Sequence, residues 1–142
     1  MFKFIGRGGH GRVYQSKENE VTKVGDIGPN EVSCQREAAE MGLSPDVLDH
    51  SDNSITMRKV KGQTVYSKGS MTPQQYQKLV EKVGKAHAAR LFHNDLVAAN
   101  VMITEDDDIQ IIDWGRGSTN WPDPECRDDE DQLEQIQRRY VK

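Results

Sequence analysis

The sequence predicts a two-part α+β fold, in which a five-stranded antiparallel sheet with one helix precedes a short, mostly helical part. Short β-branched or alternating runs, separated by polar turns, fill the first sixty residues. One helical stretch interrupts these runs after the third of them, and long amphipathic periodicity occurs only in the second half. The 142 residues suffice for one core. We therefore expect a single domain over residues 1–142, divided into about 1–60 and about 61–142.

The first part is expected to hold five strands and one helix. The strands cover residues 2–6, 12–16, 20–25, 47–50 and 54–59. The helix covers residues 31–41, because Val32 and Ala39 recur at helical spacing and Gly42 follows as a C-terminal cap.

The second part opens with a strong helix signal. Thr72 is a good N-cap, Pro73 suits the first helical position and Gln75 completes a capping box, so a helix is expected to run to about Arg90. Two strands at 101–104 and 109–112 form a hairpin, and a last helix covers 127–140. The acidic turn of the hairpin, residues 105–108, lacks the glycine and final glutamate of an EF-hand loop, so we interpret it as a solvated turn.

Composition narrows the class of protein. Hydrophobic residues make up 35% and charged residues 30%, as in ordinary soluble globular proteins. The net charge of −4 gives no support for nucleic acid or an anionic membrane as partner, and no apolar run approaches the roughly 20 residues of a membrane span. Cys34 and Cys126 lack metal-ligand spacing and are expected to be free thiols. No secretory signal is recognised, and a cytoplasmic location is expected.

A glycine-rich stretch lies between the first two predicted strands. Residues 6–13, GRGGHGRV, fit the pattern G-x-G-x-x-G-x-V. Its candidate phosphate-binding positions are Gly6, Gly8, Gly9, Gly11 and Val13. A position between two strands, rather than between a strand and a helix, argues against a dinucleotide site and favours a hairpin that closes over phosphates. Glycines let backbone N–H groups approach phosphate oxygens.

Lys23 lies on the third predicted strand and can pair with phosphates if a carboxylate of the following helix orients it. We chose Glu37 for that carboxylate because it lies mid-helix. Glu31 and Glu40 remain alternatives, although acidic residues such as Glu31 are expected in a first helical turn for dipole reasons alone.

Residues 93–100, HNDLVAAN, followed by Asp113-Trp114-Gly115, carry the strongest chemical signal. Asp95 is placed to orient an acceptor hydroxyl and receive its proton, while Asn100 and Asp113 supply the oxygen ligands that Mg²⁺ prefers. His93 is expected to be a structural hydrogen-bonding residue of the loop rather than a catalyst.

Taken in order, these motifs resemble those of a protein kinase reduced to a minimum, over residues 6–115. The sequence is similar to small atypical kinases of the Bud and RIO type, to truncated kinase effectors of bacterial pathogens and to small phage kinases. The resemblance implies a two-lobed fold with a severely truncated helical C-lobe, a Lys23–Glu37 ion pair, and ATP with Mg²⁺ or Mn²⁺ as cofactors. It also makes Asp95 the catalytic base, Met57 the gatekeeper, and residues 58–60, including Lys59, the adenine-binding hinge.

Several positions depart from the kinase pattern. Asn94 replaces the arginine that reads a phosphorylated activation loop, which resembles kinases that need no such phosphorylation. Val97 and Ala99 stand where kinases carry a cation near the transferred phosphoryl group. Trp114 replaces phenylalanine, as in the aminoglycoside- and choline-kinase branch. Asp131 is the residue we expect to open the last helix and brace the catalytic loop.

These features favour a minimal, constitutively organised Ser/Thr protein kinase that takes a protein substrate. One alternative is a small-molecule phosphotransferase of the aminoglycoside or choline type. The other is a pseudokinase or ATPase module that acts through an activating protein partner. For an injected effector or a phage protein, the cytoplasm would be that of the host.

Overall fold

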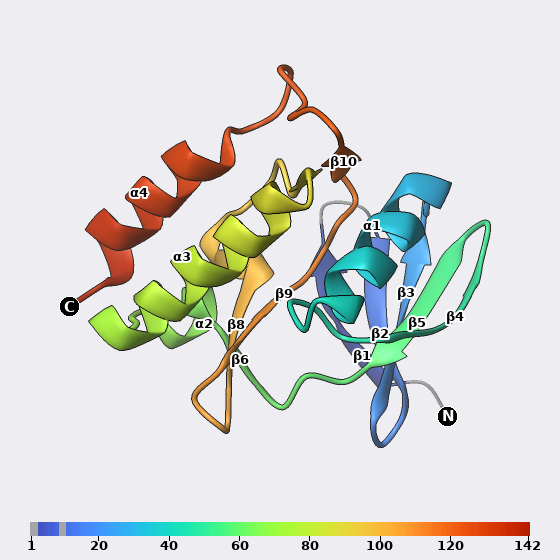
Figure 1. Cartoon of the computed structure of the whole chain (residues 1–142). Helices are drawn as coiled ribbons and strands as arrows, with labels where there is room; N and C mark the ends of the chain where they lie inside the picture. Colours follow the sequence, from blue (N-terminus) through green and yellow to red (C-terminus); the bar gives the residue numbers. More distant parts are fainter. Residues whose placement is uncertain (1–2, 9–10) are drawn as a thin grey trace.

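Five antiparallel strands and one helix form the N-lobe in the computed structural model, which describes residues 3–8 and 11–142 (Figure 1). The elements are β1 (Lys3–Gly8), β2 (Gly11–Lys17), β3 (Glu20–Gly25), α1 (Pro29–Glu40), β4 (Val47–Ser51) and β5 (Ser54–Arg58). The strands lie in the order β1-β2-β3-β5-β4. The predicted α+β class, the five-stranded sheet and the helix after the third strand are confirmed.

The register of the sheet places the strand lysine toward α1. Val13 of β2 pairs with Lys23 of β3, which in turn pairs with Ile55 of β5. Directly paired residues share a face of the sheet, so all three side chains lie on one side. Ile55 packs against Val32 of α1. Lys23 therefore lies on the face that α1 covers.

The C-lobe combines two longer helices with short strands. Its elements are β6 (Gly62–Thr64), α2 (Val65–Lys68), α3 (Pro73–Ala88), β7 (Leu91–Phe92), the 3₁₀ turn η1 (Ala98–Asn100), β8 (Val101–Thr104), β9 (Ile109–Ile111), β10 (Ser118–Thr119) and α4 (Asp129–Tyr140). Strands β6, β8 and β9 form an antiparallel sheet, and β10 pairs with β7. Helix α4 runs beside α3 (Figure 1).

Helix α3 starts as its sequence predicts. Thr72 Oγ1 accepts a hydrogen bond from the Gln75 N–H at 3.1 Å, and Gln75 Oε1 accepts one from the Thr72 N–H at 2.8 Å. The predicted capping box is therefore confirmed. Helix α4 begins two residues later than predicted, because the Asp128 side chain caps it by accepting from the N–H groups of Glu130 and Asp131.

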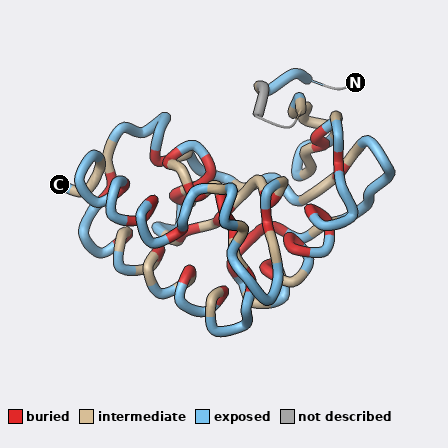
Figure 2. The backbone as a smooth tube through the Cα atoms, turned by 90° about the horizontal axis from the view of Figure 1, so that it is seen from above, coloured by how far each residue is buried: buried red, intermediate tan, exposed pale blue. Residues whose placement is uncertain are grey.

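Buried apolar side chains are concentrated in the C-lobe and thin out toward the N-terminal strands (Figure 2). Helix α1 contributes Cys34 and Ala38, and the residue Leu43 beyond it, to the larger core cluster. The smaller cluster, in the N-lobe, contains Ile27, Val32 and Ile55. Because α1 contacts both clusters, it is the element that joins the two lobes through packing.

The acidic turn between β8 and β9 is exposed and lies against α3. Asp107 accepts a hydrogen bond from Gln75 at 2.6 Å, and Lys82 lies 3.6 Å from Asp108. Within residues 3–8 and 11–142, no group of three or more His, Cys, Asp or Glu side chains is arranged to hold a metal ion. None of the helices described is both long and apolar enough to cross a membrane.

Candidate active site

Lys23 is the centre of a buried ion-pair cluster that joins the lobes. Its Nζ lies 2.7 Å from Glu31 Oε2 and 3.1 Å from Asp113 Oδ1. The side chains of Lys23 and Glu31 are only 5% and 3% exposed, and that of Asp113 is 15% exposed. A charge buried this deeply requires close partners, because removal from water costs several kcal/mol per ion. The cluster therefore holds β3, the start of α1 and the chain after β9 in one arrangement.

The prediction that Glu37 is the partner of Lys23 is wrong, and Glu31 takes that place. Residues six apart on a helix are separated by about 240° around its axis, so Glu31 and Glu37 cannot share a face. Glu31 lies on the buried stripe that continues through Gln35 and Ala38, whereas Glu37 is only half-buried.

His93 holds the backbone of the candidate catalytic loop, residues 93–100. Its Nδ1 accepts a hydrogen bond from the Asp95 N–H at 3.2 Å, which places the ring proton on Nε2. Nε2 then donates to the carbonyl oxygen of Ile112 at 2.8 Å. The ring also makes an edge contact with Trp114, at 4.7 Å between centroids. These contacts confirm the expected structural role of His93, and they tie the loop to the chain that carries Asp113.

Asp129, at the start of α4, fixes the same loop from the other side. Its carboxylate accepts hydrogen bonds from the backbone N–H groups of His93 at 3.0 Å and Asn94 at 2.9 Å, and lies 2.9 Å from His87 Nε2. Burial alone would raise the pKa of Asp129. The hydrogen bonds from His87 and the two backbone groups outweigh burial, and the pKa lies below its usual value.

The expectation that Asp131 braces the loop is therefore wrong. Asp131 is exposed and stands about 200° around the helix from Asp129, so it points away from the loop.

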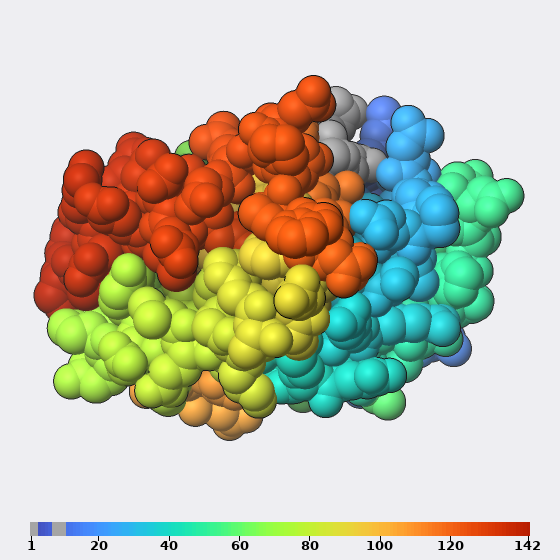
Figure 3. Space-filling view, turned by 45° about the horizontal axis from the view of Figure 1, so that its top comes forward, coloured from blue at the N-terminus to red at the C-terminus, as the bar shows by residue number. Residues whose placement is uncertain are grey.

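Asn94 fastens the segment that follows Gly115 directly to the loop. Its Nδ2 donates to the carbonyl oxygen of Arg116 at 2.9 Å and to Ser118 Oγ at 2.8 Å, and its Oδ1 accepts from the Asp123 N–H at 3.3 Å. Asn94 has a left-handed backbone with φ of 67°, which asparagine tolerates better than arginine. Its amide therefore holds this segment without any phosphate group. The fastened segment runs across the molecule between α4 and α1 (Figure 3).

Asp95 lies between an amide and a guanidinium. Asn100 Nδ2 donates to the Asp95 carbonyl oxygen at 2.9 Å and reaches Asp95 Oδ2 at 3.5 Å. On the other side, Arg127 Nε lies 3.7 Å from Asp95 Oδ1. The pair is partly open to water, since the Arg127 side chain is 61% exposed. Sequence reasoning missed Arg127 because it stands far from the loop in the chain, within no spacing motif.

The donor set around Asn100 and Asp113 fits Mg²⁺. The backbone N–H of Ile112 donates to the Asn100 carbonyl oxygen at 2.9 Å, which brings the two predicted ligands near each other. Because Nδ2 of Asn100 donates to Asp95, its Oδ1 is the atom left to act as a hard oxygen ligand. Mg²⁺ sites that handle nucleotides use one or two protein oxygens, with phosphates and waters completing the shell. Asn100 and Asp113 suffice by that measure.

The glycine hairpin lies at the end of the sheet, where Gly6 pairs with Val13 and Gly8 pairs with Gly11. Gly11 has a structural reason to be glycine, because a Cβ there would lie 2.3 Å from the carbonyl oxygen of Val24. A Cβ on Gly6 would meet no atom of the described residues within 4 Å. The predicted position Gly9 lies outside the described residues.

The predicted gatekeeper, Met57, and the predicted hinge residue Lys59 differ in their surroundings. Met57 pairs with Val21 of β3, packs on the smaller core cluster and accepts a weak hydrogen bond from Gln35 Nε2 at 3.4 Å. The Lys59 side chain instead donates to Gln15 Oε1 at 3.1 Å, and its backbone N–H donates to the Asn19 carbonyl oxygen. Lys59 is thus engaged by contacts with β2 and the β2–β3 turn.

Trp114 is fully buried, and its indole N–H donates to Ser44 Oγ at 2.8 Å. This hydrogen bond satisfies the buried indole N–H, a donor that phenylalanine does not have.

In this site a lysine of the sheet, Lys23, is paired with a helix glutamate, Glu31. The loop below carries Asp95 and, five residues later, Asn100. This combination defines a protein-kinase-like fold. The comparisons narrow this class. The family model for the RIO domain matches residues 7–125, and the chain belongs to this family of atypical kinases and ATPases. The family is an ATP-binding one.

A similarity to one curated protein extends over part of the chain. An uncharacterized protein of Dictyostelium discoideum is 34% identical over 78 residues, which are 54% of this chain. The match spans only 8% of the length of that relative.

Proposed function

We propose that this chain transfers the γ-phosphate of Mg·ATP to a serine or threonine hydroxyl of a protein substrate. The observation that carries the proposal is the position of Lys23, which is buried between Glu31 and Asp113 at 2.7 and 3.1 Å. A purely structural fold has little need for a lysine paired with two carboxylates in its interior, since such a cluster is seldom more stable than an apolar one. A buried ammonium group at this position is explained if it binds the phosphates of a nucleotide.

Each residue then has a chemical role. Lys23 holds the α- and β-phosphates, and Glu31 fixes the direction of its ammonium group. Asp95 orients the acceptor hydroxyl and takes its proton, while Asn100 restrains Asp95 through the 2.9 Å hydrogen bond. Mg²⁺, when held by Asn100 and Asp113, supplies positive charge at the phosphate oxygens.

Arg127 provides the cation that Val97 and Ala99 do not. A positive group near the transferred phosphoryl lowers the barrier by stabilising the charge of the transition state. The Arg127 guanidinium lies next to Asp95, and therefore near the position that an acceptor hydroxyl would take. This placement supports an active enzyme over a pseudokinase that lacks the charge altogether.

The test is phosphotransfer from labelled ATP to a protein mixture, with Asp95→Asn as the decisive variant. The loss of a general base typically costs about 10²- to 10⁴-fold in rate. We expect labelling of proteins by the unmodified chain, a loss of that order in the variant, and unchanged thermal unfolding. Labelling that persists in Asp95→Asn would contradict the proposal.

A role as a partner-dependent ATPase module is a second candidate, favoured by the ion pair that already engages Asp95 Oδ1. A partner that draws Arg127 away would free the carboxylate. ATP turnover that requires an added partner protein, without transfer to any hydroxyl, would support this candidate over the first.

A further inference from the structure

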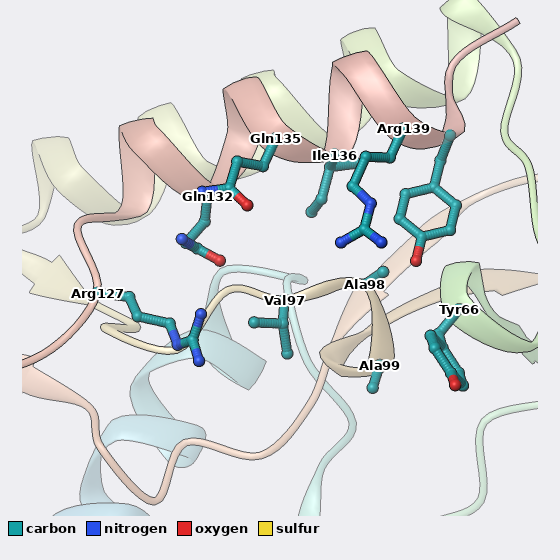
Figure 4. Close-up of a pocket in the computed structure, with 10 residues that line it drawn as sticks. Tyr66, Val97, Ala98, Ala99, Arg127, Gln132, Gln135, Ile136 and Arg139 are labelled. Atoms are coloured by element: carbon teal, nitrogen blue, oxygen red, sulfur yellow. The ribbon is translucent and has the colours of Figure 1, made fainter.

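A pocket of about 300 Å³ lies between α4 and the loop that follows Asp95 (Figure 4). Tyr66 of α2 and Val97 of the catalytic loop form one side of it, and α4 forms the other. This volume is at the lower end of the range for small-ligand sites, about 300 to 1,000 Å³, and is enough for one or two amino-acid side chains.

The pocket adjoins the proposed catalytic base. Arg127 lines it and also lies 3.7 Å from Asp95 Oδ1. Val97 and Ala99, which follow Asp95 closely in the chain, belong to its wall as well. A group seated in the pocket therefore lies beside the carboxylate that would receive the proton of an acceptor hydroxyl.

The wall of the pocket is largely apolar, and its polar groups are cationic or neutral. It includes the guanidinium groups of Arg127 and Arg139 and the amides of Gln132 and Gln135, and it contains no aspartate or glutamate. Figure 4 shows the Arg139 side chain turned from α4 toward the catalytic loop. Within the described residues, Arg139 takes part in no ion pair. Asp95 lies next to Arg127, so the positive charge that remains in the pocket is that of Arg139.

We propose that this pocket binds the acceptor, and that it selects a serine or threonine whose neighbour in the peptide carries a carboxylate or a phosphate. The acceptor role rests on the proposed function. Guanidinium groups bind such anions through charge-assisted and often paired hydrogen bonds. The same charges disfavour aminoglycosides, choline and other cationic acceptors. Tyr66, which is 69% exposed at the rim, offers an open aromatic surface suited to an extended peptide.

The transfer step balances within these groups. The serine oxygen forms a bond to the γ-phosphorus while its proton passes to Asp95. The bond between that phosphorus and the oxygen bridging to the β-phosphate breaks, and ADP leaves with the electron pair. Arg139 is a binding residue for the neighbouring anion and does not touch the reacting atoms.

The experiment uses three fluorescent peptides that are identical except for the residue next to serine, which is glutamate, glutamine or lysine. Binding is measured by anisotropy, and phosphate transfer is measured separately with labelled Mg·ATP. We expect the glutamate peptide to bind about tenfold more tightly than the glutamine peptide, as for one charge-assisted hydrogen bond, and the lysine peptide to bind least.

Two arginines of α4 make a matched pair of variants. Arg139→Gln should bring the ratio of glutamate-peptide to glutamine-peptide affinity close to one. Arg138→Gln should preserve the ratio, because Arg138 pairs with Glu134 and is not part of the pocket lining.

Equal affinity for the three peptides, or a preference that survives Arg139→Gln, would overturn the inference, even if all three are phosphorylated. An Arg139-dependent preference without transfer to any peptide would keep the pocket as an anion-selective peptide site and would contradict the proposed phosphotransfer.

Discussion

The two halves of the site are built in opposite ways. In the C-lobe, the loop of residues 93–100 is held by hydrogen bonds that His93 and Asn94 donate, some of them to the Asp129 carboxylate, next to a large apolar core. In the N-lobe, the sheet carries a small core, and it is connected to the C-lobe by Lys23, by α1 and by the residues just after α1, such as Leu43 and Ser44. The half that would handle the acceptor hydroxyl is thus fixed by many contacts, and the half that would hold the nucleotide is fixed by few.

Breaking the buried ion pair at the junction of the two halves should give the largest effect. Glu31→Ala removes the closest partner of Lys23 and leaves a buried ammonium with Asp113 alone. We expect unfolding free energy to fall by about 3 kcal/mol, as when one partner of a buried pair is removed. ATP affinity should fall as well. Chemical denaturation and nucleotide titration measure both.

Glu37→Ala is the matched control on the same helix. It should change the unfolding free energy by no more than about 0.5 kcal/mol, as for ordinary surface positions. An effect as large as that of Glu31→Ala would mean that α1 is rotated relative to the structure.

The second-largest expected loss of stability comes from weakening the hydrogen bonds that hold the loop in the C-lobe. Asp129→Asn keeps the side-chain shape but removes the charge that accepts from His93, Asn94 and His87. We expect a loss of about 2 kcal/mol at neutral pH, because hydrogen bonds to a charged group contribute about 1.5 to 3 kcal/mol.

The pH dependence of this loss follows from the lowered pKa of Asp129. Since that pKa lies below its ordinary value of 3.8, the carboxylate stabilises the fold fully above about pH 3.8. This stabilisation disappears as the pH falls through the lower folded-state pKa. The gap between wild type and Asp129→Asn, measured by urea denaturation, should therefore be constant near neutrality and close in acid. A gap that instead widens in acid would show that the pKa is raised.

Two glycines of the hairpin test the N-lobe half with a smaller effect. Gly11→Ala places a methyl group against the Val24 carbonyl oxygen and should destabilise by about 1 to 2 kcal/mol, as overpacking does. Gly6→Ala meets no atom of the described residues within 4 Å, so we expect the stability of the fold to be almost unchanged. If phosphate oxygens approach the hairpin backbone, Gly6→Ala should still weaken ATP binding. Thermal unfolding and nucleotide titration separate the two effects.

The smallest effect concerns a thiol of α1. Burial, with Glu37 and Glu31 nearby, raises the pKa of Cys34 to about 11. The thiolate that reacts with alkylating agents is therefore scarce at pH 8. We expect iodoacetamide to leave Cys34 unmodified in the native chain and to label it after unfolding, as mass spectrometry would show. Rapid native labelling would mean that α1 opens easily and that the link between the halves is weak.

The sequence predicted elements whose signals are local. The capping box of α3 and the run of β3 were visible because each depends on neighbouring residues. Strands β6, β7 and β10 were not predicted, since two or three residues show no periodicity and form only where a partner strand is present.

Among the site residues, too, the sequence predicted those with local signals and missed those that depend on long-range contacts. The motif positions Lys23, Asp95, Asn100 and Asp113 were identifiable from spacing. Their partners Glu31 and Arg127 could not be identified in this way. Choosing Glu31 over Glu37 requires the rotation of α1 against the sheet. Finding Arg127 requires the path of the segment after Gly115, which brings a distant side chain to Asp95.

The hydrogen bonds of Asn94 have a consequence for timing. An amide that holds the segment after Gly115 is present as soon as the chain is synthesised, whereas a phosphate must be added by another enzyme and can be removed again. Under the proposed function, the protein would become competent at the rate at which it folds. Its output in a cell would then follow the balance of synthesis and degradation, and its history of modification would leave no trace in its activity.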